Sequence, residues 1–594
     1  MNHAHRRLRV GFLAGLLLTT TVAADDARLA TAGEAVDDWL TYGHGWANQR
    51  YSALENITRD NVARLRPAWI HQTGKLGTFP ANPLVVDGVM YLTAPGNDVI
   101  ALDAASGAER WRYRHRLATE DLCCGVHNRG LAWGYGRLYM ITADARFIAL
   151  EASDGSVVWD IPVVDPQSDD PADLDAIRVY DPAHPGAFER YTRFAGNMAP
   201  VVHGGRVFVG VSGTGYSAVL GDAEAQSASV LGRPGVRDGL RAFLSAYDAH
   251  DGRLLWRWYA TAAKGWEGDF TPTTAFGDDL HRDLDAERAA APAHREAWRG
   301  GGGSIYSSPS IDPALGLVYF GTGNASPTYA DQLRPGDNLY TSSLVALDVA
   351  TGALRWYHQV VPHDIWGYDS ASPPVLLDLP RADGTARPVL AAASKTGWLY
   401  ILDRRTGEPL RRSEPFVPQN AMMFHRPTTA GILAAPGAAG GANWPPAAWH
   451  PGTGLVYVPA SHQPTRYRLE SGADGHPVNV LDFMNDAERW GTLTAIDPRD
   501  GQIRWQAKSP LPLMSGALAT AGGLVFAGES NGDFSAFDAA DGARLWRFAT
   551  GAGVNAPAVT YRVDGRQYVA VAAGGHALFR FPQGDAVIAF ALPE

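Results

Sequence analysis

Cysteine is almost absent from this sequence. Its 594 residues contain two, the neighbours Cys123 and Cys124, so a framework of several disulfides is excluded. No Cys-x-x-Cys-His occurs, so the attachment motif for a covalent haem is missing. A bridge between neighbours would be strained, because adjacent Cα atoms lie about 3.8 Å apart and disulfides prefer roughly 4.4–6.8 Å. The pair is either two free thiols or one vicinal disulfide that serves shape and surface chemistry rather than stability.

Long apolar runs are also missing beyond the first two dozen residues. At the N-terminus, basic residues precede an apolar run over residues 10–22, and Ala23-Ala24 follows it. This order predicts a secretory signal peptide over residues 1–24; an uncleaved membrane anchor is the alternative, although the run is short for a membrane span. We expect the mature chain, residues 25–594, to lie in the periplasm without a membrane span. Disulfides persist there, which favours the vicinal bridge.

Charged residues are few, at 19% of the chain, and the net charge is −11. This balance argues against binding to nucleic acid or to anionic membrane surfaces, and it suits a basic partner. The 65 glycines and 18 tryptophans are typical of many short strands joined by tight turns.

What the sequence does contain is an internal repeat. Each copy is a strand, an Asp-x-x-x-Gly turn (or Glu-x-x-x-Gly in one copy) and a strand that carries Trp four residues after the Gly. The acidic residue caps the turn and the Gly supplies a positive φ. The complete copies have their Gly and Trp at Gly107 and Trp111, Gly155 and Trp159, Gly252 and Trp256, Gly352 and Trp356, Gly501 and Trp505, and Gly542 and Trp546, and a weaker copy has Gly407 alone.

A pair of strands with a tight turn precedes each of these seven copies, and an eighth pair begins near Pro557, which makes eight units of four short strands. Such units in radial array form a β-propeller, so we expect an all-β fold with eight blades in a single domain over residues 25–594. The last unit lacks a Trp strand, whereas Leu65–Trp69 is a Trp strand with no unit before it. We therefore expect this N-terminal strand to close the ring, and the repeat tryptophans to pack between blades. Residues 165–193 and 269–299 interrupt the pattern as long loops, the second partly helical.

Several further motifs are specific. They are Cys123-Cys124 with Asn128-Arg129-Gly130, Gly301-Gly302-Gly303, Tyr319–Asn324, Arg334–Asn338, Pro362–Trp366 and Ala519–Gly522. With these motifs the chain resembles the quinoprotein alcohol dehydrogenases, a family that includes methanol dehydrogenase, from about Trp39 to about Gly575. The resemblance implies an eight-bladed propeller that uses pyrroloquinoline quinone (PQQ) and a bound metal ion, calcium or a lanthanide.

The resemblance also implies roles for individual residues. Cations and hydrogen-bond donors suit a cofactor with three carboxylates, and a metal ion at the quinone acts as a Lewis acid. Asn324 corresponds to a metal ligand. The positions implied for cofactor binding are Cys123 and Cys124 as a disulfide against one face of the quinone, Arg129 at a carboxylate, Thr142 as a hydrogen-bonding residue, Ser304, Tyr306 in place of a stacking tryptophan, Lys395 near the reactive carbonyls, Asn443 and Trp444.

The chain departs from this family at the position of the catalytic base. Gly367 stands where the family has its catalytic aspartate, and Asp369 lies two residues further on. Lanthanide-dependent members carry an extra metal-binding aspartate at that place. Asp369 is therefore a metal ligand, a relocated base or a residue of the blade turn.

Two other carboxylates of the family are missing. Gly215 falls at or near the metal-binding glutamate, and Pro80 falls at a cofactor-contacting glutamate. An insertion after Gly215 contains Asp222 and Glu224, either of which would restore a carboxylate.

We expect a periplasmic PQQ-dependent dehydrogenase that oxidises an alcohol, or a related sugar or aldehyde, and passes electrons to a soluble cytochrome c or a similar acceptor. Asp369 would be the catalytic base, Lys395 would stabilise the reduced quinone, and Asn324 with Asp369 would hold the metal. The alternative is a non-catalytic propeller that binds PQQ or serves as a scaffold, since two carboxylates are lost together. The vicinal cysteines with Arg129 favour the enzyme.

Overall fold

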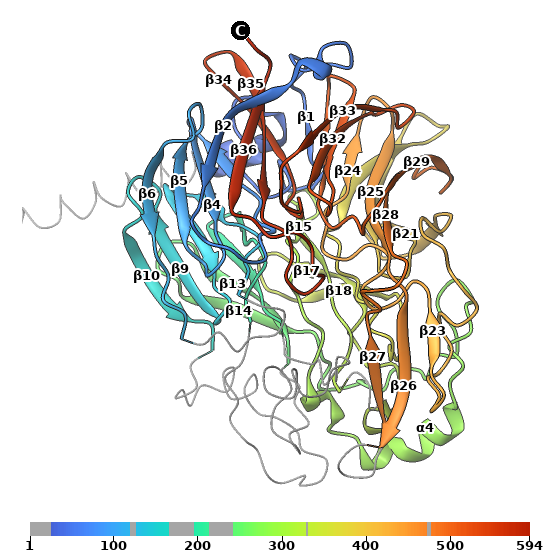
Figure 1. The fold of residues 1–594 in the computed structure, drawn as a ribbon. Coiled ribbons are helices and arrows are strands. Elements are labelled where there is room, and N and C mark those ends of the chain that lie inside the picture. Colours follow the sequence, from blue (N-terminus) through green and yellow to red (C-terminus); the bar gives the residue numbers. More distant parts are fainter. Residues whose placement is uncertain (1–24, 119–125, 165–194, 213–240, 328–330, 472–476) are drawn as a thin grey trace, which may run out of the picture.

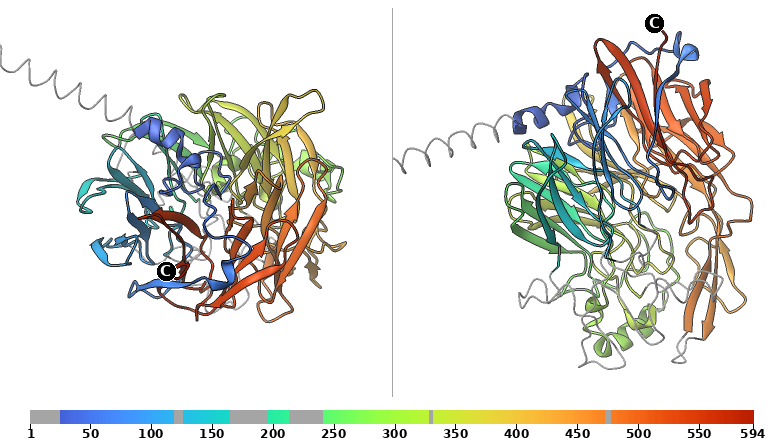
Figure 2. Two further views of the ribbon diagram at one scale, coloured as in Figure 1. Left: turned by 90° about the horizontal axis from the view of Figure 1, so that it is seen from above. Right: turned by 60° about the vertical axis from the view of Figure 1, so that its left-hand side comes forward.

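The protein is built of short antiparallel sheets that follow one another around the molecule (Figures 1 and 2). The structure is a computed structural model that describes residues 25–118, 126–164, 195–212, 241–327, 331–471 and 477–594. The chain is all-β, as the sequence predicts. In most sheets the four strands are consecutive in sequence and neighbours in space, because each turn folds the chain straight back on the preceding strand.

Eight sheets contain the four-strand units. The first four consist of β3 (Leu84–Val86), β4 (Val89–Thr93), β5 (Val99–Asp103) and β6 (Glu109–Tyr113); β7 (Ala132–Gly134), β8 (Arg137–Ile141), β9 (Arg146–Glu151) and β10 (Val157–Pro162); β11 (Val201–His203), β12 (Arg206–Gly210), β13 (Phe243–Asp248) and β14 (Leu254–Tyr259); β15 (Ser310–Asp312), β16 (Leu317–Gly321), β17 (Ser343–Asp348) and β18 (Leu354–Gln359).

The remaining four consist of β19 (Val375–Pro380), β20 (Ala386–Ala393), β21 (Leu399–Asp403) and β22 (Pro409–Arg412); β24 (Ala448–His450), β25 (Leu455–His462), β28 (Trp490–Ile496) and β29 (Ile503–Ser509); β30 (Ala517–Thr520), β31 (Leu524–Gly528), β32 (Asp533–Asp538) and β33 (Arg544–Ala549), joined by β1 (Tyr51–Ser52); β34 (Val559–Val563), β35 (Arg566–Ala573) and β36 (Ala586–Ala591), joined by β2 (Arg66–Gln72).

The N-terminal strand β2 lies in the same sheet as the last strands of the chain (Figure 1). It pairs antiparallel with β36, with Trp69 opposite Ala589. The sequence predicts this partner for the Trp strand that has no unit before it.

The repeat tryptophans join one sheet to the next. Trp111 donates its indole N–H to Ala152 O at 3.1 Å, in the turn of the following unit. The glycine of that turn, Gly155, lies so close that a Cβ atom on it would be 2.5 Å from Trp111 Cε3. The same donation to a following unit is made by Trp69, Trp159, Trp256, Trp356 and Trp505. This contact agrees with the packing role predicted for the tryptophans and explains why most of these turns keep glycine.

A buried arginine connects the N-terminal segment to three sheets. Arg50 is fully buried and donates to Ala517 O at 2.9 Å, to Asn82 Oδ1 at 3.0 Å and to Ala558 O. Burial lowers the pKa of Arg50 to about 10. Its acceptors lie in β30 or just before β3 and β34, so one side chain holds the first, seventh and eighth units together.

Two additions lie at the same end of the molecule (Figures 1 and 2). One is the loop of residues 269–299, which contains α4 (Leu284–Ala290) and so is partly helical as predicted. Asp283 begins this helix by accepting a hydrogen bond from Ala286 N. The other is a three-stranded sheet of β23 (Ile432–Ala434), β26 (Thr465–Ser471) and β27 (Pro477–Asp482), which the repeat pattern does not predict. The 3₁₀ turns are Ala32–Glu34, Val62–Arg64, Ala291–Ala293, Ala297–Gly300 and Asp331–Leu333.

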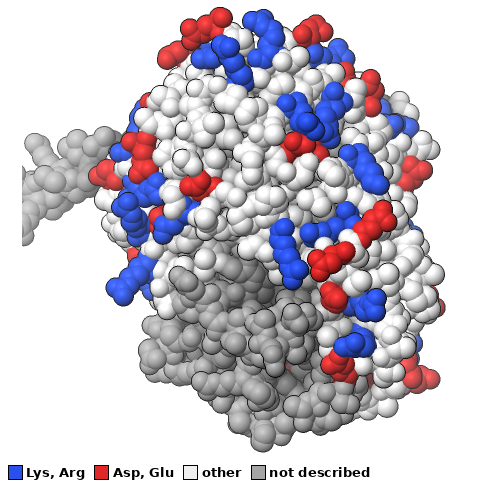
Figure 3. Space-filling view, in the orientation of Figure 1, with Lys and Arg blue, Asp and Glu red and all other residues white. Residues whose placement is uncertain are grey.

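Among the described residues, no helix is long and apolar enough to cross a membrane. On the face shown in Figure 3, basic and acidic side chains are interspersed. The predicted signal peptide, the pair Cys123-Cys124, the loop of residues 165–193 and Gly215 with its insertion lie outside the described residues, so these predictions stay predictions.

Candidate functional site

Asp369 is the centre of a buried polar cluster. It lies in the loop between β18 and β19, and its side chain is 1% exposed. Lys395, just after β20, forms an ion pair through its Nζ with Asp369 Oδ2 at 2.7 Å. Asn324 N donates to Asp369 Oδ1 at 2.8 Å, and Tyr306 OH donates to Oδ2 at 2.7 Å. Three donors, one of them an ammonium, thus point at this carboxylate.

These contacts bear on the alternatives for Asp369. A residue that only completes a blade turn would bond within its own turn, as the turn aspartates do. The Asp369 carboxylate instead meets residues 306, 324 and 395, which come from three other places in the chain. The geometry therefore favours a ligand or a base over a turn residue.

The loop that carries Asp369 is held by a second carboxylate. Asp364 Oδ1 accepts hydrogen bonds from the backbone N–H groups of Trp366 and Gly367, each at 2.9 Å. Complete burial raises the pKa of Asp364. Gly367 has a φ of +84°, a backbone conformation that strains other residues. Asp364 is thus structural, and Gly367 shapes the backbone that presents Asp369.

Tyr306 connects the carboxylate to the next part of the site. Its hydroxyl lies 2.7 Å from Asp369 Oδ2 and 3.2 Å from Asn443 Oδ1. Its backbone oxygen accepts from Arg129 Nη1 at 3.2 Å. The backbone at Gly323 lies close to the same carboxylate, since a Cβ atom on Gly323 would be 3.1 Å from Asp369 Oδ1. The structure therefore brings Tyr306, Asn443, Asn324, Asp369 and Lys395 together, although they are far apart in the sequence.

Arg129 and Trp444 form an aromatic and cationic wall beside Tyr306. The Arg129 guanidinium carbon lies 5.3 Å from the centre of the Tyr306 ring and 5.0 Å from that of Trp444. Arg129 is 4% exposed. A buried guanidinium among aromatic rings is suited to a planar anion, because it pairs with carboxylates and stacks on flat surfaces.

His576 extends this wall and is absent from the sequence prediction. It follows β35, and its ring stacks on Trp444 with 5.2 Å between centroids. The only signal in the sequence is a histidine after Gly574-Gly575 at the end of an apolar strand, which is more often a core residue than a functional one. Its position next to Trp444 depends on two units that are far apart in the chain.

Two residues that the sequence predicts for cofactor binding, Thr142 and Ser304, make other contacts in the described structure. The Thr142 hydroxyl is buried and hydrogen-bonds within its own turn, to Asp144 Oδ1 at 2.6 Å and from Arg146 N at 2.8 Å. Ser304 meets the cluster through its backbone, where its O accepts from Gly323 N at 2.9 Å. Their predicted contacts with a cofactor stay predictions.

The residues present fit an anionic planar cofactor. Arg129 and Lys395 supply cations, and the buried Trp444 Nε1 has no hydrogen-bond partner among the described residues. A buried N–H group without an acceptor destabilises the fold, and an acceptor on a bound ligand would remove this penalty.

A metal ion fits less well. Among the described residues, no three His, Cys, Asp or Glu side chains are grouped to hold one. Asn324 and Asp369 offer oxygens, but Lys395 already lies on Asp369 Oδ2, and Ca²⁺ takes six to eight oxygen ligands. These side chains do not by themselves complete a metal site.

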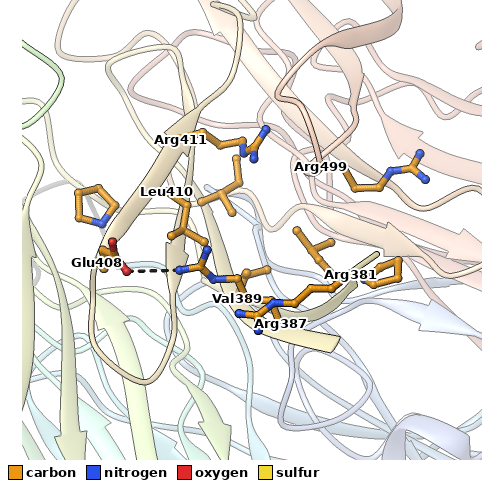
Figure 4. Close-up of a pocket in the computed structure, with 11 residues that line it drawn as sticks. Arg381, Arg387, Val389, Glu408, Leu410, Arg411 and Arg499 are labelled. Atoms are coloured by element: carbon orange, nitrogen blue, oxygen red, sulfur yellow. Dashed lines mark hydrogen bonds and ion pairs between the residues drawn. The ribbon is translucent and has the colours of Figure 1, made fainter. Parts of the chain in front are cut away.

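A separate cavity of about 440 Å³ opens between β19–β22 and Arg499 (Figure 4). Arg381, Arg387, Arg411 and Arg499 line it together with Glu408, which accepts from Arg387 at 3.3 Å. It shares no residue with the cluster around Asp369.

Comparison with known proteins identifies the family. The family model for the glucose, ethanol and alcohol dehydrogenase β-propeller domain that uses PQQ matches residues 39–422 and 478–569. The chain belongs to the quinoprotein alcohol dehydrogenases. It is 33% identical to the dehydrogenase subunit of the quinone alcohol dehydrogenase of Komagataeibacter europaeus, over 97% of this chain and 78% of that one.

Solved structures of quinoprotein dehydrogenases agree with this assignment. The quinohemoprotein alcohol dehydrogenase of Comamonas testosteroni matches with a TM-score of 0.77 and 30% identity, over 97% of this chain and 85% of that one. A europium-containing methanol dehydrogenase matches with a TM-score of 0.75 and 28% identity, over 95% of this chain and 100% of that one. As a quinoprotein alcohol dehydrogenase, the chain is an oxidoreductase of the class that acts on CH–OH groups.

Proposed function

We propose that this protein is a periplasmic PQQ-dependent dehydrogenase that oxidises an alcohol, with Asp369 as the base. The observation that carries the proposal is the cluster in which Lys395, Tyr306 and Asn324 all point donors at Asp369. It supports a carboxylate that is held by three donors beside a cationic and aromatic wall suited to the quinone. Eight four-stranded units, closed by β2 in the last, would be the eight blades of the propeller.

Each residue has a task in this mechanism. Arg129 and Trp444 bind and orient the cofactor through its carboxylates, and Tyr306 stacks beside it. PQQ, when bound, would supply a quinone that accepts the carbon-bound hydrogen of the alcohol together with two electrons. Asp369 takes the hydroxyl proton of the alcohol, which general base catalysis requires. Lys395 stabilises negative charge that develops nearby.

Asn324 and Asp369 are the side chains that would contribute to a calcium or lanthanide site, although by themselves they do not complete one. No step of this proposal runs through the metal. The predicted contacts of Cys123, Cys124, Thr142, Ser304 and Asn443 with the cofactor are part of the proposal.

We infer that the electrons leave to an external acceptor, such as a soluble cytochrome c. Residues 1–594 contain no Cys-x-x-Cys-His, the attachment motif for a covalent haem. The basic and apolar N-terminal segment supports export to the periplasm. Reduction of added cytochrome c by the enzyme, alcohol and PQQ would support this acceptor; reduction of an artificial dye but not of cytochrome c would contradict it.

The role of Asp369 is tested by Asp369→Asn. We expect turnover with an artificial dye acceptor to fall about 10²–10⁴-fold, while the absorbance titration with PQQ changes only a few-fold. The matched control is Asp378→Asn, an exposed carboxylate on β19 that pairs with Arg404, and it should keep full turnover. Unchanged turnover in Asp369→Asn would exclude the base.

The non-catalytic alternative makes a different prediction for the unmodified protein. Tight PQQ binding without turnover on a panel of alcohols, sugars and aldehydes would indicate a binding protein. No PQQ binding at all would indicate a scaffold.

A further inference from the structure

His576 is a buried imidazole with an unused polar atom. The residue is 2% exposed, and its Nδ1 has no hydrogen-bond partner among the described residues. Its ring lies between aromatic neighbours, with 5.2 Å to Trp444, 5.0 Å to Phe579 and 6.1 Å to His127 between centroids. A histidine that served packing alone would place its nitrogens on protein acceptors, as His44 does with Tyr51 O and Ala35 O.

The unused atom of His576 is accompanied by a second one. Trp444, on which His576 stacks, also has a buried Nε1 without a partner among the described residues. Arg129 lies over the same tryptophan at 5.0 Å. One small region thus combines a guanidinium, an indole N–H and an imidazole. Among the described residues, no carboxylate forms a hydrogen bond with Trp444 Nε1 or with His576 Nδ1.

The chemistry of this region is that of an anion site. A guanidinium pairs with a carboxylate, an indole N–H only donates, and an imidazole donates from either nitrogen when it is suitably protonated. A ligand with several carboxylates on an aromatic frame would satisfy all three groups and would lie against the aromatic rings.

We propose that His576 is a further cofactor-binding residue, which together with Trp444 Nε1 donates to a carboxylate of bound PQQ beside Arg129. This inference rests on the proposed function, because it takes PQQ as the ligand. It assigns to PQQ recognition a residue that lies more than 440 positions from Arg129 in the chain.

The proposal predicts that protons are taken up when PQQ binds. In the free protein, burial and the nearby Arg129 lower the pKa of His576 to about 3, so the ring is neutral at pH 7. The titratable groups that face the ring are Arg129 and His127, since Trp444 and Phe579 do not titrate. A carboxylate brought next to His576 raises its pKa, and binding then tightens as the pH falls.

The test is an absorbance titration with PQQ for the unmodified protein, His576→Phe and His576→Asn. Phe keeps the stack on Trp444 but removes both nitrogens, whereas Asn restores a donor. We expect His576→Phe to weaken PQQ binding about 10- to 100-fold at pH 6, which is the range of one charge-assisted hydrogen bond. His576→Asn should recover part of this loss.

Proton uptake gives a readout that a packing role would not change. Calorimetric titration in two buffers of different ionisation enthalpy counts the protons taken up per PQQ, and the count should fall in His576→Phe. Equal affinity and equal proton uptake in the unmodified protein and His576→Phe would overturn the inference and leave the proposed function standing. Failure of the unmodified protein to bind PQQ would overturn both the inference and the proposed function.

If His576→Phe does not fold, the PQQ affinity of His576→Asn is compared with that of the unmodified protein at pH 6 and pH 8 instead. Equal affinities at both pH values would overturn the inference.

Discussion

Lys395 and Asp369 form a buried ion pair, with Nζ 2.7 Å from Oδ2 and side chains that are 4% and 1% exposed. The pair lies at the centre of the site, and further polar contacts hold each partner in place. Lys395 also donates to Gly367 O at 3.2 Å, and Asp369 accepts from Asn324 N. Gly367 and Asp369 are thus joined by one ammonium group.

Breaking this pair from one side should destabilise the fold. Lys395→Met leaves the carboxylate of Asp369 buried without its cation, and we expect the free energy of unfolding to fall by about 3–5 kcal/mol. The double variant Lys395→Met with Asp369→Asn carries no unpaired charge and should be more stable than Lys395→Met alone. Urea unfolding of the two variants measures this. Additive losses in the double variant would contradict the coupling.

The Tyr306 hydroxyl should matter less than its ring. Tyr306→Phe removes the hydrogen bonds to Asp369 and Asn443 but keeps the surface against Arg129, so we expect a loss of about 1–2 kcal/mol in the free energy of unfolding. PQQ affinity should change only a few-fold in this variant, and Tyr306→Ala should weaken it much more. Equal PQQ affinity in both variants would show that the ring does not stack on the cofactor.

The contact between sheets can be tested at a turn. Gly155 and Gly136 have nearly the same φ, +74° and +72°, so alanine strains both backbones similarly. A Cβ atom on Gly155 would meet Trp111 at 2.5 Å, whereas one on Gly136 would meet nothing within 4 Å. We expect Gly155→Ala to be less stable than Gly136→Ala by about 1–3 kcal/mol in urea unfolding. Equal stabilities would mean that the tryptophan contact is not tight.

Acid should destabilise the free protein through His576. Its pKa is lowered to about 3 in the fold by burial and by Arg129, whereas an unfolded histidine titrates near 6.5. The unfolded chain therefore binds this proton first, so the contribution of His576 to stability is full above pH 6.5 and falls as the pH drops toward 3. By pH 5 the loss is about 2 kcal/mol.

His576→Phe should remove this part of the acid sensitivity. Urea unfolding of both proteins at pH 7 and pH 5 gives the difference. The prediction fails if the two proteins lose the same stability between these pH values.

Much of the fold could be predicted because its signal is local and repeated. A turn such as that of Gly155, followed by Trp159, carries its own geometry, and repetition turns one weak pattern into a strong one. The pairing of β2 with β36 was predictable because the N-terminal end has one strand of a unit and the C-terminal end has the other three. The sheet of β23, β26 and β27 was not, since it belongs to no repeat and forms from strands separated by two strands of another sheet.

The candidate site divides in the same way. Asp369, Lys395 and Asn324 could be found because each stands in or near a motif that the family shares. His576 could not, because its significance lies in a stack on Trp444 that only the folded chain produces. The role of Asp369 also needed the structure, because sequence alone could not separate a blade-turn residue from one that meets Tyr306 and Lys395.

The most direct test of the account is an absorbance titration of the purified protein with PQQ, in the presence of calcium or of lanthanum, followed by dye reduction on a panel of alcohols. The account predicts saturable PQQ binding and alcohol-dependent dye reduction that Asp369→Asn abolishes without loss of binding. PQQ binding without dye reduction on any alcohol, whichever metal is added, would contradict it.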